Sequence, residues 1–168
     1  LMRFHLLTGG QRIAQLSRVT ITEWDADSQT ILILDGKGRR QRPRRHYVPL
    51  TPAAVQCMAD MRGKGLGPYI FTADHGVSGA QYFVFSRRLA AVVADMIEAG
   101  ELPGGKFTPG DIRRTVETRL AAAGQSSDAR AHLQSHGLGG VQARHYDRHE
   151  YGKKKRSALD LLLQIMTQ

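Results

Sequence analysis

The stretch Thr108-Pro109-Gly110-Asp111-Ile112-Arg113-Arg114-Thr115 marks the start of a helix and places two arginines in its first turns. It opens with a hydroxyl residue followed by proline, and Asp111 stands where a capping box usually has Glu or Gln. Gly124 is a typical helix-ending residue. Between these signals, apolar residues recur at the spacing of one helix face: Ile112, Val116 and Leu120. The sequence therefore predicts a helix that runs to about Ala123.

The two arginines of this stretch point in different directions. Arg113 lies beside the apolar stripe, so we expect its side chain to reach into a cleft at the edge of the core. Arg114 lies about 100° further around the helix axis, and we expect it to pair with Glu117. The alternative is an ion pair between Arg113 and Glu117, which are four residues apart.

Around this helix, the sequence predicts a mainly α domain with one small antiparallel β-sheet, an α+β fold that covers residues 1–168. Two short apolar runs, Ile31–Leu34 and His46–Leu50, indicate the strands of a hairpin, with turn residues at Asp35-Gly36-Lys37-Gly38. Further helices are expected over 1–16 with a break at Thr8-Gly9-Gly10, over 51–62, 82–98, 129–135 and 141–146, and from about Lys155.

Composition and charge favour a nucleic-acid partner. Lys and Arg number 24 against 15 acidic residues, for a net charge of +9 and a pI near 10.2. Neutralising phosphates is the commonest physical reason for such an imbalance, although a merely soluble basic protein is the alternative. The one cysteine, Cys57, suits a reducing, cytoplasmic compartment and a place in the core. No apolar run is long enough to span a membrane, and no signal peptide is visible.

Two cationic residues lie in turns where they can approach a phosphate. Arg12 follows the glycine pair at the start of a helix, although an isolated arginine there is usually a surface residue. Lys37 lies between glycines at the expected hairpin tip. A basic loop follows it, for which a purely solvated role is the alternative: Arg39, Arg40, Arg42, Arg44 and Arg45.

A histidine and a tyrosine near the C-terminus complete a set of groups suited to phosphodiester chemistry. His136 lies in a glycine-rich turn, where its imidazole can hydrogen-bond a phosphate. Tyr146 is the candidate nucleophile, because surrounding cations favour the phenolate form, and Tyr151 is its rival. No metal site is indicated: His145 and His149 lie four residues apart, but no third ligand is evident. No nucleotide-binding loop is present either, so no cofactor is expected.

Taken in chain order, five segments of the sequence resemble the catalytic domain of the tyrosine recombinases, or phage integrases. Leu7-Thr8-Gly9-Gly10-Gln11-Arg12 is similar to the first arginine box, and Gly110-Asp111-Ile112-Arg113-Arg114-Thr115 to the second. Asp35-Gly36-Lys37-Gly38 is similar to the hairpin lysine. Leu133-Gln134-Ser135-His136 and His145-Tyr146-Asp147-Arg148-His149 are similar to the Leu-Gly-His and nucleophile segments. The resemblance covers nearly the whole chain.

The resemblance implies a role for each residue. Tyr146 would attack DNA to form a 3′-phosphotyrosyl link, while Arg12 and Arg113 stabilise the pentavalent transition state. Lys37 would protonate the leaving oxygen, and His136 would assist at the phosphate. The implied partner is a double-stranded DNA attachment site, the implied source is bacterial or phage-encoded, and the chemistry needs neither metal nor nucleotide. The C-terminal helix would dock on a neighbouring protomer of a tetramer, although packing on its own core is the alternative.

Three positions depart from the family pattern. Gly110 stands where the second box usually has histidine, so His145, His132 or water would fill that place. Gln15 replaces an acid often found three residues after the first arginine. Gln134-Ser135 stands where the Leu-Gly-His element has one glycine. We also expect this chain to be a fragment that lacks an upstream DNA-binding domain and therefore binds DNA weakly.

Three other functions use the same features. A non-catalytic DNA-binding module would need only the fold and the basic surface. A type IB-like topoisomerase would share the chemistry without paired sites, and an RNA-binding domain would use the charge alone.

Overall fold

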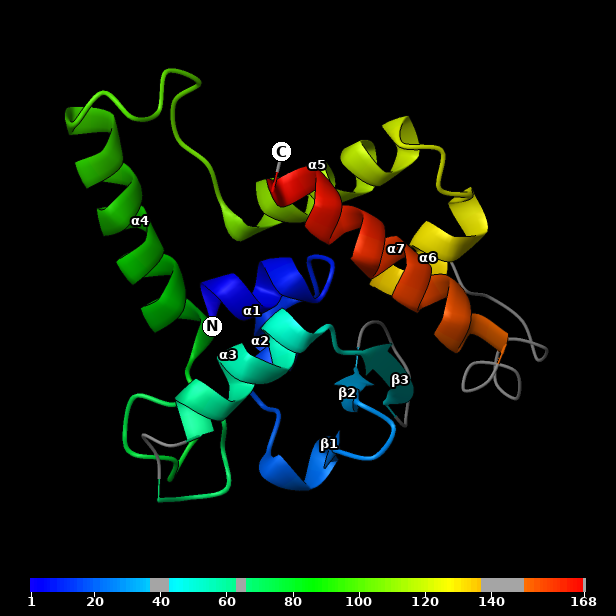
Figure 1. Cartoon of the computed structure of the whole chain (residues 1–168). Coiled ribbons are helices and arrows are strands. Elements are labelled where there is room, and N and C mark those ends of the chain that lie inside the picture. Colours follow the sequence, from blue (N-terminus) through cyan, green and yellow to red (C-terminus); the bar gives the residue numbers. More distant parts are fainter. Residues whose placement is uncertain (37–42, 63–65, 137–149, 168) are drawn as a thin grey trace.

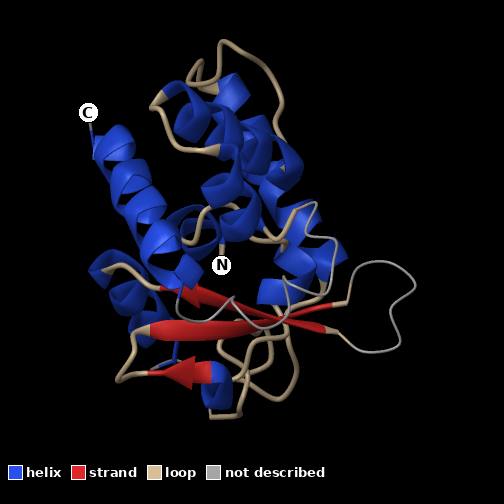
Figure 2. Ribbon diagram, turned by 90° about the vertical axis from the view of Figure 1, so that its right-hand side faces the viewer, coloured by secondary structure: helices blue, strands red, loops and turns tan. Residues whose placement is uncertain are grey.

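The chain folds as a set of helices packed on one side of a small antiparallel sheet (Figures 1 and 2). The computed structural model describes residues 1–36, 43–62, 66–136 and 150–167. In chain order the elements are α1 (Met2–Leu7), α2 (Ile13–Leu16), the 3-10 helix η1 (Ile21–Glu23), β1 (Trp24–Asp25), β2 (Thr30–Asp35), β3 (Arg44–Pro49), α3 (Pro52–Arg62), α4 (Tyr82–Glu98), α5 (Pro109–Ala122), α6 (Ser127–Gln134) and α7 (Glu150–Thr167). This confirms the predicted α+β class.

The sheet has the order β1-β2-β3, and both strand pairs are antiparallel. Ile31 lies opposite Val48 and Ile33 opposite His46, and all four side chains are buried. Alternate residues of a strand face the same side of a sheet, so this register turns one apolar face toward the helices. The predicted hairpin strands are confirmed, while the tip with Lys37 lies outside the described residues.

The core joins the first helix to the last. Phe4 of α1 packs on Phe71 with ring centroids 5.0 Å apart, and Cys57 is buried as expected. Leu159 and Leu162 of α7 are buried in the same cluster, which confirms that this helix packs on its own core. Exposed apolar residues also occur on α4, which stands away from the other helices in Figure 1. No described helix is both long and apolar enough to cross a membrane.

Helix α7 begins at Glu150, five residues before the predicted start near Lys155. Side-chain contacts with α6 stabilise this first turn, although Gly152 within it disfavours helix. The Tyr151 ring stacks on His132 with centroids 3.3 Å apart, and the Lys154 Nζ lies 3.1 Å from an Asp128 oxygen. Local propensity did not reveal these contacts. The predicted helix over 141–146 lies outside the described residues.

Helix α5 has the predicted capping box, with Thr108 and Asp111 each accepting from the other's backbone N–H. The predicted pairing of Arg114 with Glu117 is wrong. Arg114 donates instead to Asp111, and Glu117 accepts from Arg130 of α6 at 2.7 Å. Asp111 is held beside Arg114 by the cap, and the packing of α6 on α5 brings in Arg130. A pairing rule within one helix cannot anticipate that second contact.

Candidate active site

The glycine turn between α1 and α2 brings the first arginine segment against α5 and α6. Gly9 and Gly10 have φ values of +81° and +74°, a left-handed conformation that glycine adopts readily. A Cβ on Gly10 would lie 3.0 Å from the Arg113 Cα, and one on Gly9 would lie 2.8 Å from a Leu133 methyl carbon. The turn therefore needs glycine for its conformation and for its close contacts. It ends at Arg12, the N-cap residue of α2.

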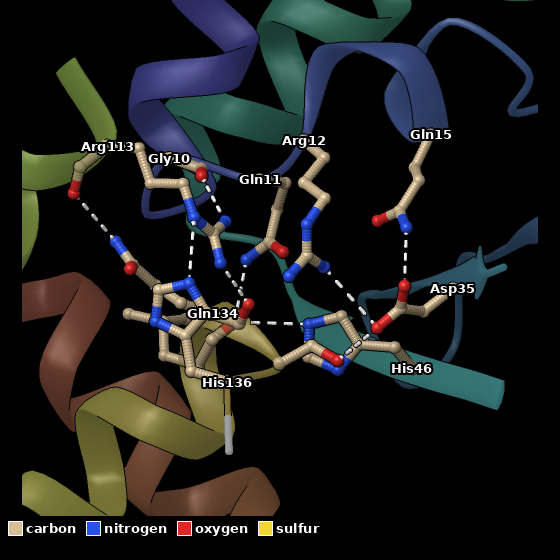
Figure 3. Close-up of polar contacts among 11 residues, drawn as sticks. Gly10, Gln11, Arg12, Gln15, Asp35, His46, Arg113, Gln134 and His136 are labelled. Atoms are coloured by element: carbon tan, nitrogen blue, oxygen red, sulfur yellow. Dashed lines mark hydrogen bonds and ion pairs between the residues drawn. The ribbon is translucent and has the colours of Figure 1, made fainter. Parts of the chain in front are cut away.

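Arg113 is anchored by three neutral acceptors (Figure 3). Its Nη1 donates to the Gly10 carbonyl at 2.6 Å, its Nη2 donates to the Gln134 carbonyl, and its Nε donates to His136 Nε2 at 3.3 Å. Burial, together with the nearby charge of Arg12, lowers the pKa of Arg113 to about 10, and Asp35 opposes this shift. Arg113 thus remains charged at neutral pH. Each terminal nitrogen keeps a second N–H beyond these bonds.

Arg12 lies in the same region as Arg113 and pairs with a buried carboxylate. Its Nη1 is 3.3 Å from Oδ2 of Asp35, the last residue of β2. Asp35 Oδ1 also accepts from Gln15 Nε2 at 2.6 Å, and Oδ2 accepts from Ser135 Oγ at 2.7 Å. Figure 3 shows the Arg12 and Arg113 guanidiniums on either side of Gln11. Arg12 is close enough to Arg113 for its positive charge to contribute to the lowered pKa of Arg113.

The end of α6 places the imidazole of His136. Ser135 has a φ of +54°, the left-handed conformation that glycine favours, and it ends α6 as the C-cap residue. Gln134 connects this turn to the glycine turn and to α5, since its Nε2 donates to the Gly9 and Arg113 carbonyls at 3.1 and 3.0 Å. Because His136 Nε2 accepts from Arg113, its proton would lie on Nδ1.

Three of the five predicted catalytic residues thus come together: Arg12, Arg113 and His136. Lys37, Tyr146 and the loop arginines Arg39, Arg40 and Arg42 lie outside the described residues, so their placement stays a prediction. Arg44 and Arg45 are in β3, where Arg45 is exposed and donates to the Tyr47 hydroxyl at 3.0 Å.

Sequence reasoning missed Asp35, Gln134 and Ser135 as parts of the site. The sequence pattern marks Asp35 only as a turn residue, and no local pattern links it to Arg12, which lies 23 positions earlier. A charged residue at the end of an apolar strand was the one available signal, because unpaired acids are rarely buried.

Gly110, which stands where the resembled family usually has histidine, lies at a position with room for a side chain. Gly110 is exposed, and the nearest atoms to a Cβ there would be 3.5 Å away. His132, one candidate to fill it, instead stacks on Tyr151 and lies 3.5 Å from an Asp128 oxygen. His145 lies outside the described residues.

Comparison with known proteins gives a clear structural answer. No protein-family model matches the sequence, and no curated protein matches it. Among solved structures, the integrase of mycobacterium phage Brujita matches 96% of this chain with a TM-score of 0.70 and 17% identity. The Tn1549 transposon integrase in complex with circular intermediate DNA matches 92% with 0.64 and 20% identity, and XerA recombinase matches 94% with 0.61 and 19% identity.

The chain has the tyrosine-recombinase catalytic fold. At these identities the likeness establishes the fold alone. The matches cover 50% of the Brujita integrase, 54% of the Tn1549 integrase and 55% of XerA recombinase, so this chain spans about half their length.

Proposed function

We propose that residues 1–168 are the catalytic domain of a site-specific tyrosine recombinase, which cuts and rejoins DNA without metal. Tyr146 is the nucleophile, Lys37 the general acid, and Arg12, Arg113 and His136 hold the reacting phosphate. One observation carries the proposal: Arg113 is half-buried beside a second arginine, and the hydrogen bonds described for it go to neutral acceptors. A partly buried cation whose described hydrogen bonds all go to neutral groups is stabilised by an incoming anion.

The geometry suits a phosphodiester under attack. Negative charge gathers on the two non-bridging oxygens, and guanidiniums donate to both with paired hydrogen bonds. Arg113 has two N–H groups available beyond its anchoring bonds, and Arg12 has donors beyond its contact with Asp35. Tyr146 then attacks phosphorus, the DNA 5′ oxygen leaves with a proton from Lys37, and the bond energy stays in the phosphotyrosyl link. Attack by another 5′-hydroxyl reverses the step.

The proposed partner is double-stranded DNA, held mainly through its phosphates. A groove of about 380 Å³ opens beside Arg12, and Arg18 and Gly36 are among the residues that line it. Arg39, Arg40, Arg42, Arg44 and Arg45 would contact phosphates flanking the reacting one. The net charge of +9 supports electrostatic capture. A cytoplasmic location in bacteria or phage-infected cells follows from such a substrate.

The covalent intermediate is the direct test. The protein is mixed with a pool of nicked duplexes of randomised sequence and then denatured, and protein-linked DNA is measured. We expect adduct from the wild type and from Tyr151→Phe, and none from Tyr146→Phe. DNA binding without any adduct would instead identify a non-catalytic binding module. Relaxation of supercoiled plasmid without paired sites would favour a topoisomerase, and preference for RNA in competition would favour an RNA-binding domain.

The C-terminal helix is the proposed contact between protomers of a tetramer on DNA. Leu159 and Leu162 are committed to the core, but Met166 is 37% exposed beside a groove of about 580 Å³ between α1, α5 and α7. Because deleting α7 would remove core residues, a point variant is the sharper test. Met166→Lys should leave folding intact and weaken assembly on DNA, measured by the mass of the complexes. Unchanged assembly would refute this role.

A further inference from the structure

Asp35 is the buried acid that connects the separate segments of the site. Its carboxylate is 4% exposed and lies at the end of β2, two residues before Lys37 in the sequence. It accepts hydrogen bonds from Arg12 at 3.3 Å, Gln15 at 2.6 Å and Ser135 at 2.7 Å (Figure 3). Arg12 and Gln15 belong to the start of α2, while Ser135 immediately precedes His136. One side chain therefore links the hairpin strand, the first arginine and the turn that carries the imidazole.

We propose that Asp35 is a positioning residue for Arg12 and His136. We also propose that positions 15 and 35 together supply one carboxylate and one amide to the site, and that these two groups can exchange positions. In this chain the negative charge near Arg12 comes from β2, and the neutral amide comes from α2. The inference rests on the proposed function for its activity readout. It also makes a separate statement about folding: the site accommodates one carboxylate across positions 15 and 35, and either backbone position can supply it.

The short distance between the side chains of positions 15 and 35 excludes an acidic residue at both positions. Gln15 Nε2 and Asp35 Oδ1 are 2.6 Å apart, so glutamate at position 15 would bring two carboxylates into contact next to one arginine. Like charges at such a distance destabilise the ionised pair, and one of them would take up a proton. Two amides would also fail, because no anion would then remain beside Arg12. One acid and one amide satisfy both the hydrogen bond and the charge.

While position 15 is glutamine, asparagine at position 35 cannot reproduce the role of the aspartate. The three described groups that contact the carboxylate donate to it, and they use both of its oxygens. The asparagine amide replaces one oxygen with an NH₂ group and carries no negative charge, so Arg12 would lose its ion-pair partner and Gln15 would have to turn its amide to accept from the new NH₂ group. Arg12 and Ser135 would then shift, and with them the guanidinium and the imidazole. A displacement of about 1 Å at such a site costs roughly 100-fold in rate.

A reciprocal exchange tests the inference. The variants are Asp35→Asn, Gln15→Glu and the double variant, each compared with the wild type in adduct formation on duplexes with a bridging 5′-sulfur. A thiolate leaves without needing a proton, so the rate reports on phosphate positioning rather than on Lys37. We expect each single variant to lose roughly 10- to 100-fold in rate and the double variant to recover to within about threefold of wild type. A rate for Asp35→Asn within about twofold of wild type would overturn the inference.

DNA affinity separates positioning from general damage to the fold. Asp35→Asn removes a negative charge, so it should bind random duplex DNA as tightly as wild type or more tightly, while its rate falls. A purely structural role would lower affinity and rate together, and the double variant would recover neither. Thermal midpoints give a readout that does not depend on activity: each single variant should melt lower and the double variant should regain most of the loss. If wild type formed no adduct, the proposed function would fail, and the midpoints alone would decide whether the two positions are exchanged.

Discussion

Replacing Gly10 with alanine tests whether the glycine turn sets the position of Arg113. Gly10 has a φ of +74°, and a Cβ there would lie 3.0 Å from the Arg113 Cα and 3.3 Å from its Cβ. The Gly10 carbonyl also accepts from the Arg113 guanidinium at 2.6 Å. Alanine would therefore push the glycine turn away from α5 at Arg113, the residue whose side chain is proposed to bind the phosphate.

The cost has two parts. Left-handed backbone costs a non-glycine residue about 1–2 kcal/mol, which lower entropy of the unfolded chain offsets by roughly 0.4–1 kcal/mol. Overpacking against Arg113 adds about 1–3 kcal/mol. We expect a total near 3 kcal/mol, which for a domain of this size lowers Tm by roughly 6–12 °C. Displacement of Arg113 should also reduce adduct formation about 100-fold.

Gly124 provides a matched control. Its φ is +83°, but a Cβ there would meet nothing within 4 Å. Gly124→Ala should therefore show only the conformational cost, about 1 kcal/mol, and keep the wild-type rate. Urea unfolding and the adduct assay compare the two variants directly. If Gly10→Ala lost no more stability than Gly124→Ala and reacted at the same rate, the close approach of the turn to α5 would not matter to the site.

Three other properties follow from the described contacts. Burial lowers the pKa of His5 in the folded chain. As pH falls through about 6.5, the unfolded chain therefore binds more protons than the folded chain, and stability should decline. His5→Asn should show a smaller drop in Tm than wild type between about pH 7.5 and pH 5.5. Tyr151→Phe keeps the ring stack on His132 and should leave Tm unchanged, whereas Tyr151→Ala should lower stability by about 2–4 kcal/mol in urea unfolding. Arg45→Gln should reduce the slope of log affinity against log salt by about 0.9 in a DNA titration, and an unchanged slope would exclude a phosphate contact there.

Much of the fold could be predicted because its signals are local. The bounds of α4 and the capping box of α5 follow from periodicity and cap residues a few positions apart. The early start of α7 could not be predicted in this way, since the ring stack of Tyr151 on His132 depends on how two helices pack. The misassigned partner of Arg114 has the same origin. Sequence patterns predict an element well when the energy that ends or begins it comes from its own residues.

The site shows the same division between local and long-range information. Arg12 and Arg113 could be chosen because Arg12 follows a glycine turn and Arg113 lies in the first turn of a helix with clear start signals, and the structure places Arg12 close enough for its charge to lower the pKa of Arg113. Asp35 could not be chosen as a site residue, because its described partners lie 20 to 100 positions away along the chain. Cationic residues that bind a ligand occur in local motifs, whereas the acid that orients them can come from any neighbouring segment.

The two arginines are supported in different ways, and this difference suits their proposed work. Arg12 is paired with Asp35, so part of its charge is already balanced and its position is set by an ion pair. Arg113 is fixed by carbonyls and an imidazole, which set its direction without neutralising it. An incoming phosphate therefore gains most from Arg113, while Arg12 supplies a donor at a defined place. If both arginines had carboxylate partners, anion binding would require breaking an ion pair; with neither, two partly buried like charges would repel each other. Among the described residues, Asp35 is the one carboxylate that pairs directly with either guanidinium, so positive charge remains for a phosphodiester to neutralise.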